Sequence, residues 1–151
     1  MVASSLHPAF ERAPAHHRWS GPLPELRAKL EAEAAKIAPR FAWRVLAHGA
    51  CVAMQRLDDV LICRISRDVV PPRGSERKWD QELATFRREL RLDRWEEEDA
   101  PEAVGVARLF RCPVALLCDQ GCGRKISEMG QLFGGSTCDH CALALKLGRT
   151  A

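Results

Sequence analysis

Two pairs of cysteines near the C-terminus constrain this 151-residue chain more than any other feature. Cys118 and Cys122 form the first pair, and Cys138 and Cys141 form the second. Zn²⁺ takes four thiolate or imidazole ligands in a tetrahedron, and two short segments that each supply two thiolates satisfy that geometry. A redox dithiol would need only one such pair. The spacing therefore predicts one structural zinc ion bound by these four cysteines.

The residues next to both pairs support the same interpretation. Gly121 and Gly123 permit a tight turn in which backbone N–H groups point at sulfur. Residues 142–147 have helical composition, so the second pair is expected at a helix N-terminus, where the helix dipole favours thiolate over thiol. Cys112 and His140 remain alternatives that could replace one of the four ligands.

A zinc ion enclosed by four cysteines is expected to be structural, because a catalytic zinc keeps one position open. The chain contains no His-Glu-x-x-His sequence, no glycine-rich phosphate loop and no nucleophile elbow. We therefore expect a non-enzymatic protein, and we assign no catalytic residue and no small-molecule substrate.

Two amphipathic helices are predicted before the cysteine pairs. Apolar residues recur at helical spacing over 24–38. After a break rich in proline and glycine at 71–74, Ser75 can cap a second helix. The apolar stripe of this second helix consists of Trp79, Leu83, Phe86 and Leu90. We expect the stripe to cover one face of a sheet.

The alternating segment between these helices predicts a three-stranded antiparallel sheet. The strands are expected at 41–48, 51–57 and 60–66. A two-residue turn at 49–50 would place Val45 opposite Met54, and a second turn at 58–59 would place Met54 opposite Cys63. With this register one face is apolar, and it collects Trp43, Val45, Val52, Met54, Leu61, Cys63 and Ile65.

These elements predict an α+β protein with an appended metal module. A flexible arm is expected at 1–22, because proline, histidine and serine are scattered there without periodicity. An α-β-β-β-α domain follows at 23–95. The acidic run that begins at Glu96 indicates a linker over 96–102. The zinc-binding module is expected to occupy 103–151.

The cysteine motif resembles a treble-clef zinc finger. A turn holding two cysteines is followed by glycine and by Lys125-Ile126, then by a glycine-rich return at 130–136, and then by a Cys-x-x-Cys sequence that opens a helix. Over about residues 118–147 it is most similar to the C-terminal fingers of the DksA/TraR group of bacterial RNA-polymerase-binding regulators. This resemblance implies zinc ligation by the same four cysteines.

Two classes of partner fit the charge and size of the chain. The net charge of +3 is small, so nucleic-acid binding would require a local basic patch. The candidate residues are Arg87, Arg88 and Arg91 on the second helix and Arg124, Lys125 and Lys146 near the cysteines. With the zinc module they favour a regulator that binds nucleic acid or the transcription machinery. The alternative is a protein–protein adaptor or inhibitor, encoded by a phage or mobile element, that docks on a larger host complex.

The sequence also predicts where the chain works. No segment approaches the ~18 consecutive apolar residues that a membrane-spanning helix needs. Four of the seven cysteines fall into two close pairs, which suits metal binding in a reducing compartment better than a set of disulfides. We therefore expect a cytoplasmic protein without a membrane segment.

Overall fold

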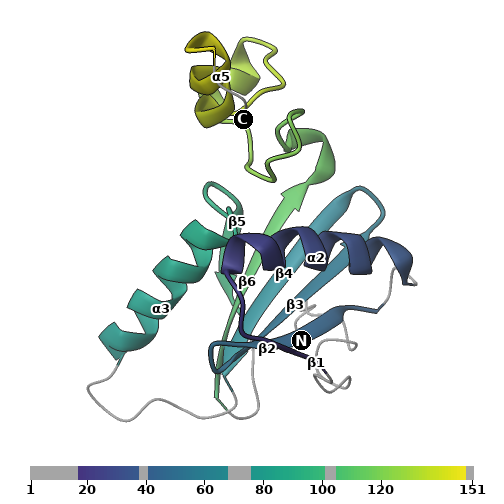
Figure 1. Cartoon of the computed structure of the whole chain (residues 1–151), viewed down its shortest axis with the longest axis vertical. Helices are drawn as coiled ribbons and strands as arrows, with labels where there is room; N and C mark the ends of the chain where they lie inside the picture. Colours follow the sequence, from purple (N-terminus) through teal and green to yellow (C-terminus); the bar gives the residue numbers. More distant parts are fainter. Residues whose placement is uncertain (1–16, 38–40, 68–75, 101–104, 149–151) are drawn as a thin grey trace.

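The computed structural model describes residues 17–37, 41–67, 76–100 and 105–148. Within them six strands form one sheet in the order β1-β2-β3-β4-β6-β5 (Figure 1). The strands are β1 (His17–Trp19), β2 (Trp43–Ala47), β3 (Ala50–Leu57), β4 (Val60–Arg67), β5 (Glu96–Asp99) and β6 (Val106–Pro113). β1 pairs with β2 in parallel, and all other neighbours are antiparallel.

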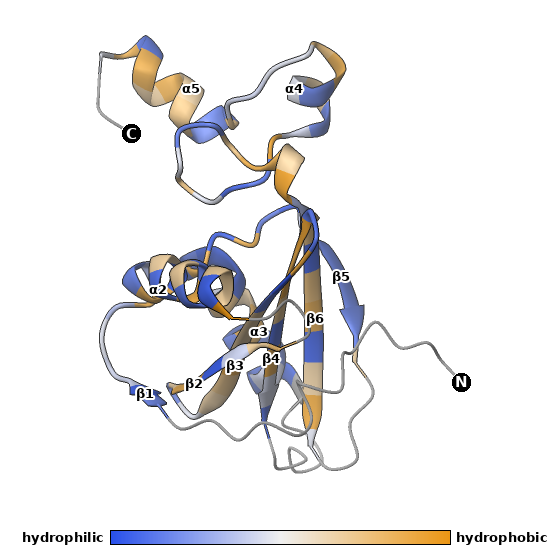
Figure 2. Ribbon diagram, turned by 90° about the vertical axis from the view of Figure 1, so that its right-hand side faces the viewer, coloured by the Kyte–Doolittle hydropathy of each residue, from blue (hydrophilic) through white to orange (hydrophobic). Residues whose placement is uncertain are grey.

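Two helices, α2 (Leu23–Lys36) and α3 (Glu76–Glu89), pack against the same face of this sheet (Figure 2). Leu26 and Leu30 of α2 are fully buried, and the predicted stripe of α3 is buried from Trp79 to Leu90. They meet the apolar face of β2, β3 and β4 in one core cluster. Burying each such large side chain contributes about 1.5–3 kcal/mol, so this layer dominates the stability of the fold. Both helices and the apolar sheet face agree with the sequence prediction.

The first hairpin turn lies one residue earlier than predicted. His48 and Gly49 form it with φ angles of 51° and 82°, so both turn residues are left-handed, as two-residue hairpins of this type require. Val45 therefore lies opposite Val52 instead of Met54. The shift is two positions, and an even shift keeps every side chain on its predicted face. The predicted pairing of Met54 with Cys63 in the second hairpin is correct.

The prediction of a three-stranded sheet was wrong. The supposed acidic linker contributes strand β5, and the residues after it contribute β6, which pairs with β4 along its full length. Opposite charges explain the pairing of these two strands, because cross-strand ion pairs stabilise neighbours in a sheet. Glu97 lies 2.9 Å from Arg108, and Glu98 lies 2.8 Å from Arg111.

β6 carries the chain out of the sheet into a separate C-terminal unit. This unit, residues 114–148 and hereafter the finger, lies beyond the end of β6 (Figure 1). It contains a short 3₁₀ turn η1 (Val114–Leu116) and two helices, α4 (Glu128–Leu132) and α5 (Asp139–Lys146).

The N-terminal segment lies partly outside the described residues. The predicted arm at 1–22 can be followed only from His17, where β1 begins, and Ser75, the predicted cap of α3, also lies outside. None of the helices in the described ranges combines the length and apolar character that crossing a membrane demands.

Candidate metal centre

The four predicted cysteines meet in the finger. Their Sγ atoms all lie within 4.8 Å of one another, and those of Cys122 and Cys138 are 3.5 Å apart. A Zn–S bond of about 2.3 Å implies sulfur atoms roughly 3.8 Å apart at the corners of a tetrahedron. Cys118, Cys138 and Cys141 are buried, while Cys122 is half-buried. The donor set and its spacing therefore fit one metal ion.

Backbone N–H groups point at the sulfurs from both segments. The N–H of Arg124 donates to Cys122 Sγ at 3.4 Å, and that of Gln120 donates to Cys118 Sγ at 3.5 Å. Cys138 is the N-cap of α5, and its Sγ accepts from the N–H of Cys141 at 3.4 Å. Such donors stabilise negative charge on sulfur and fix the orientation of the ligands. The predicted helix cap is thus present.

The thiol pKa values reflect this crowding. Burial raises the pKa of Cys138 and Cys141, and hydrogen bonds with Cys122, Cys138 and Cys118 raise the pKa of Cys141 further. Burial opposes ionisation of Cys122 as well, but hydrogen bonds from the Arg124 N–H and from the neighbouring thiols lower its pKa to about 7. Four thiols therefore share a small volume in which a divalent cation can replace their protons.

The two alternative ligands lie elsewhere. Cys112 is fully buried in β6, where it pairs with Leu61 and joins the main core. Burial raises the pKa of its thiol to about 11, which suits a packing residue. His140 is exposed on α5. Within the described residues, the close cluster of metal-ligating side chains consists of the four cysteines.

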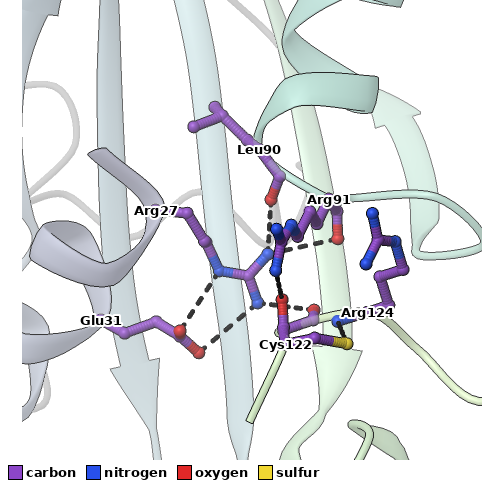
Figure 3. Close-up of polar contacts among 7 residues, drawn as sticks. Arg27, Glu31, Leu90, Arg91, Cys122 and Arg124 are labelled. Carbon is purple, nitrogen blue, oxygen red and sulfur yellow. Dashed lines mark hydrogen bonds and ion pairs between the residues drawn. The ribbon is translucent and has the colours of Figure 1, made fainter. Parts of the chain in front are cut away.

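A buried arginine ties the first cysteine turn to both long helices (Figure 3). Arg27 of α2 donates to the carbonyl of Gly123 at 2.8 Å and to the carbonyls of Leu90 and Arg91, which follow α3. Its guanidinium also lies 4.9 Å from the ring centroid of Trp95. Gly123 has φ of 86°, and a Cβ there would lie 2.9 Å from Arg27 Cζ. Glycine is therefore required for both the turn and the contact.

Arg91 forms the second link from the segment after α3 to the finger. Its Nη1 donates to the carbonyl of Cys122 at 2.8 Å, and its own φ of 58° is left-handed. The sequence had proposed Arg91 as a binding residue, and in the structure its half-buried side chain makes this contact within the protein. Arg87 also has partners within the protein, because it lies 2.8 Å from Glu97 and over the ring of Phe110, while its side chain is 36% exposed. Arg88 is 68% exposed and lies 3.9 Å from Glu89.

The remaining predicted binding residues divide between two places. Lys146 is exposed in the last turn of α5. Arg124 and Lys125 line a cavity of about 420 Å³ together with Arg94 and His140. A second cavity of about 820 Å³ adjoins it and extends past Met129 and Phe133. The two cavities share Arg94, Lys125, Ser127 and Asp139, so we call them together the junction groove.

Arg27 and Arg94 make contacts that the sequence did not predict. Arg27 sits on the buried side of α2, where a charged residue interrupts the row of leucines, and this interruption was the available indication. Trp95, which lies outside the predicted apolar stripes, is 5% exposed and packs against Arg27. Arg94 pairs with Asp139 of the finger at 3.5 Å.

Comparisons with known proteins add no relative. No protein-family model, no curated protein and no solved structure matches this chain. The likeness of the cysteine segment to DksA/TraR fingers therefore stays a resemblance.

Proposed function

We propose that the chain is a small non-enzymatic protein in which one structural Zn²⁺ holds the finger as a docking module. The metal assignment rests on the cluster of four cysteines, in which backbone N–H groups donate to the sulfur atoms. Bound zinc would be closed to substrate by four thiolates. It would supply cross-linking of two chain segments, and the surrounding residues would supply recognition.

The fold of the finger supports a treble-clef arrangement. The first pair lies in a turn flanked by an antiparallel bridge between Leu117 and Lys125, and the second pair opens α5. Zinc would join the turn to the helix. Arg27 and Arg91 then attach this unit to the α+β part through the carbonyls of Gly123 and Cys122.

The exposed apolar side chains of the finger support a protein as the docking partner. Six large apolar residues there are more than half exposed, namely Met129, Leu132, Phe133, Leu143, Leu145 and Leu147. In the described part of the chain the other exposed large apolar residue is Phe41. Apolar surface of this density in a unit of such size is typical of interaction sites. The adaptor hypothesis therefore receives the stronger support.

A double substitution on the finger tests this docking function. Leu132→Ser/Phe133→Ser removes the two most exposed apolar side chains without touching a cysteine. We expect the variant to retain zinc and to bind about tenfold more weakly to a protein that the wild type captures from its host and that is then purified. A second variant, Leu143→Ser/Leu147→Ser, changes exposed apolar side chains of α5 and its C-cap. The proposal would be contradicted if every such partner bound both variants as tightly as the wild type.

Nucleic acid is the second candidate partner, and the basic end of the junction groove supports it. Arg94, Arg124 and Lys125 line this end together. Phosphate contacts release counterions, so affinity for random DNA or RNA would fall steeply as salt increases. Titration of both nucleic acids across a salt series measures this dependence. Absence of binding at low salt would exclude this candidate and leave the docking of a protein.

A further inference from the structure

The junction groove has chemically different ends. At one end Arg94 is partly neutralised by Asp139 at 3.5 Å, and Asp139 also accepts a hydrogen bond from Ser127 at 3.2 Å. In the part of the chain that the structure describes, Arg124 and Lys125 have no ion-pair partner. Two cations thus line the groove outside ion-pair distance of the carboxylates that also line it. This end is suited to acidic groups.

The other end of the groove adds exposed apolar side chains to its charged and polar lining. Phe133 is 79% exposed and Met129 is 64% exposed there, and the buried Ile126 lines the same cavity. Gly130 belongs to the same wall, where a Cβ would meet Ile126 at 2.9 Å. Covering an exposed aromatic side chain beside a cavity with an apolar group of a partner is favourable, because it removes apolar surface from water.

Negative charge around the groove disfavours a phosphate backbone as occupant. Asp93, Glu128 and Asp139 all line it. Four thiolates around one Zn²⁺ would add a net charge of about −2 behind its wall. A nucleic-acid strand carries one charge on every nucleotide and would meet these groups along its length. A protein segment can place a single carboxylate at Arg124 and Lys125 and avoid the acidic residues elsewhere.

We infer that the junction groove binds a short acidic–apolar segment of a partner protein. One or two carboxylates lie at Arg124 and Lys125, and a neighbouring large apolar side chain covers Phe133 and Met129. This inference rests on the proposed docking function and specifies its recognition chemistry. Arg94 contributes from the loop after α3, so the complete groove requires the finger and the α+β part together.

Selection from random peptides tests the groove. Phage-displayed dodecapeptides are selected on the zinc-loaded full-length protein, and the enriched peptides are measured by fluorescence anisotropy. We expect enrichment of aspartate or glutamate next to leucine, isoleucine or phenylalanine. Lys125→Glu and Phe133→Ala should each weaken binding about tenfold. Leu143→Ala serves as the matched control, because Leu143 is 57% exposed on α5 and does not line the groove.

A charge swap separates recognition from damage to the fold. Peptides in which lysine replaces the acidic residues should bind Lys125→Glu more tightly than they bind the wild type. The inference would be overturned if the enriched peptides lacked acidic residues. It would also be overturned if oligo(dT) displaced the peptides and this displacement required both Lys125 and Phe133. Peptides sensitive to Leu143→Ala but not to Phe133→Ala would overturn it while leaving the docking function in place. Failure of both finger double variants to affect any partner would instead refute that function.

Discussion

Replacing Arg27 with methionine tests whether this arginine fastens the finger to the two long helices. Methionine keeps an unbranched apolar stem of similar reach and removes the guanidinium. The side chain is 3% exposed, so water cannot replace the lost contacts. The carbonyls of Leu90 and Gly123 would lose their charged donor.

The expected loss follows from these contacts. A hydrogen bond from a charged donor contributes about 1.5–3 kcal/mol, so the bonds to Leu90 and Gly123 together represent roughly 3–6 kcal/mol. Removing a buried charge recovers part of its desolvation cost. Glu31, the acidic partner of Arg27 at 3.4 Å, is 34% exposed and can be solvated after the substitution. We therefore expect a net loss of about 2–4 kcal/mol in the free energy of unfolding.

Urea denaturation followed by tryptophan fluorescence measures this loss. Trp95 stacks on Arg27, so its emission reports the same region. Lys29→Met is the matched control on α2, because Lys29 is 49% exposed and its pair with Glu33 at 3.7 Å is a surface contact. The control should change stability by less than about 1 kcal/mol. The reasoning is refuted if Arg27→Met is as stable as Lys29→Met in the zinc-loaded protein.

Three further substitutions probe the turn, the core and the sheet edge. Gly123→Ala should destabilise the protein by at least about 1 kcal/mol more than Gly121→Ala in the same urea assay, since both glycines have positive φ but only the first would push its Cβ against Arg27; equal losses would show that the contact is unimportant. Burial raises the pKa of Cys63 to about 12 from an ordinary value of 9.0, so the folded state holds this proton more tightly than the unfolded state and the free energy of unfolding falls as pH rises above about 9. Cys63→Ala should make that alkaline decline shallower when denaturation is measured across pH. An identical slope would contradict the assignment. Glu97→Gln, at the half-exposed pair with Arg108 and Arg87, should cost no more than about 1 kcal/mol by thermal unfolding, and a larger loss would mean that β5 depends on this residue.

Sequence periodicity was sufficient for the elements whose signals are local. The helix stripes, the faces of three strands and the four cysteines follow from spacing within short segments, and the structure brings each of them to its expected face or cluster. Strands β5 and β6 were not predicted, because a run of acidic residues is typical of a linker unless basic residues such as Arg108 and Arg111 lie beside it in the fold. That neighbour relation is a property of the folded sheet.

The attachment of the finger could not be predicted for a similar reason. Arg27 contacts carbonyls 63 and 96 residues further along the chain, and backbone acceptors carry no residue-specific signature. The same holds for Arg87 and Arg91, which were proposed as binding residues because charge on a helix suggests exposure. The tertiary fold decides which of several similar arginines also make contacts within the protein.

The zinc content of the purified full-length chain tests the central claim most directly. Inductively coupled plasma mass spectrometry should find about one zinc per chain. Cys138→Ser should lose most of this zinc, and Cys112→Ser should retain it, because Cys112 lies in the core of the sheet. A wild-type protein that is folded throughout, finger included, yet contains no metal would contradict the account.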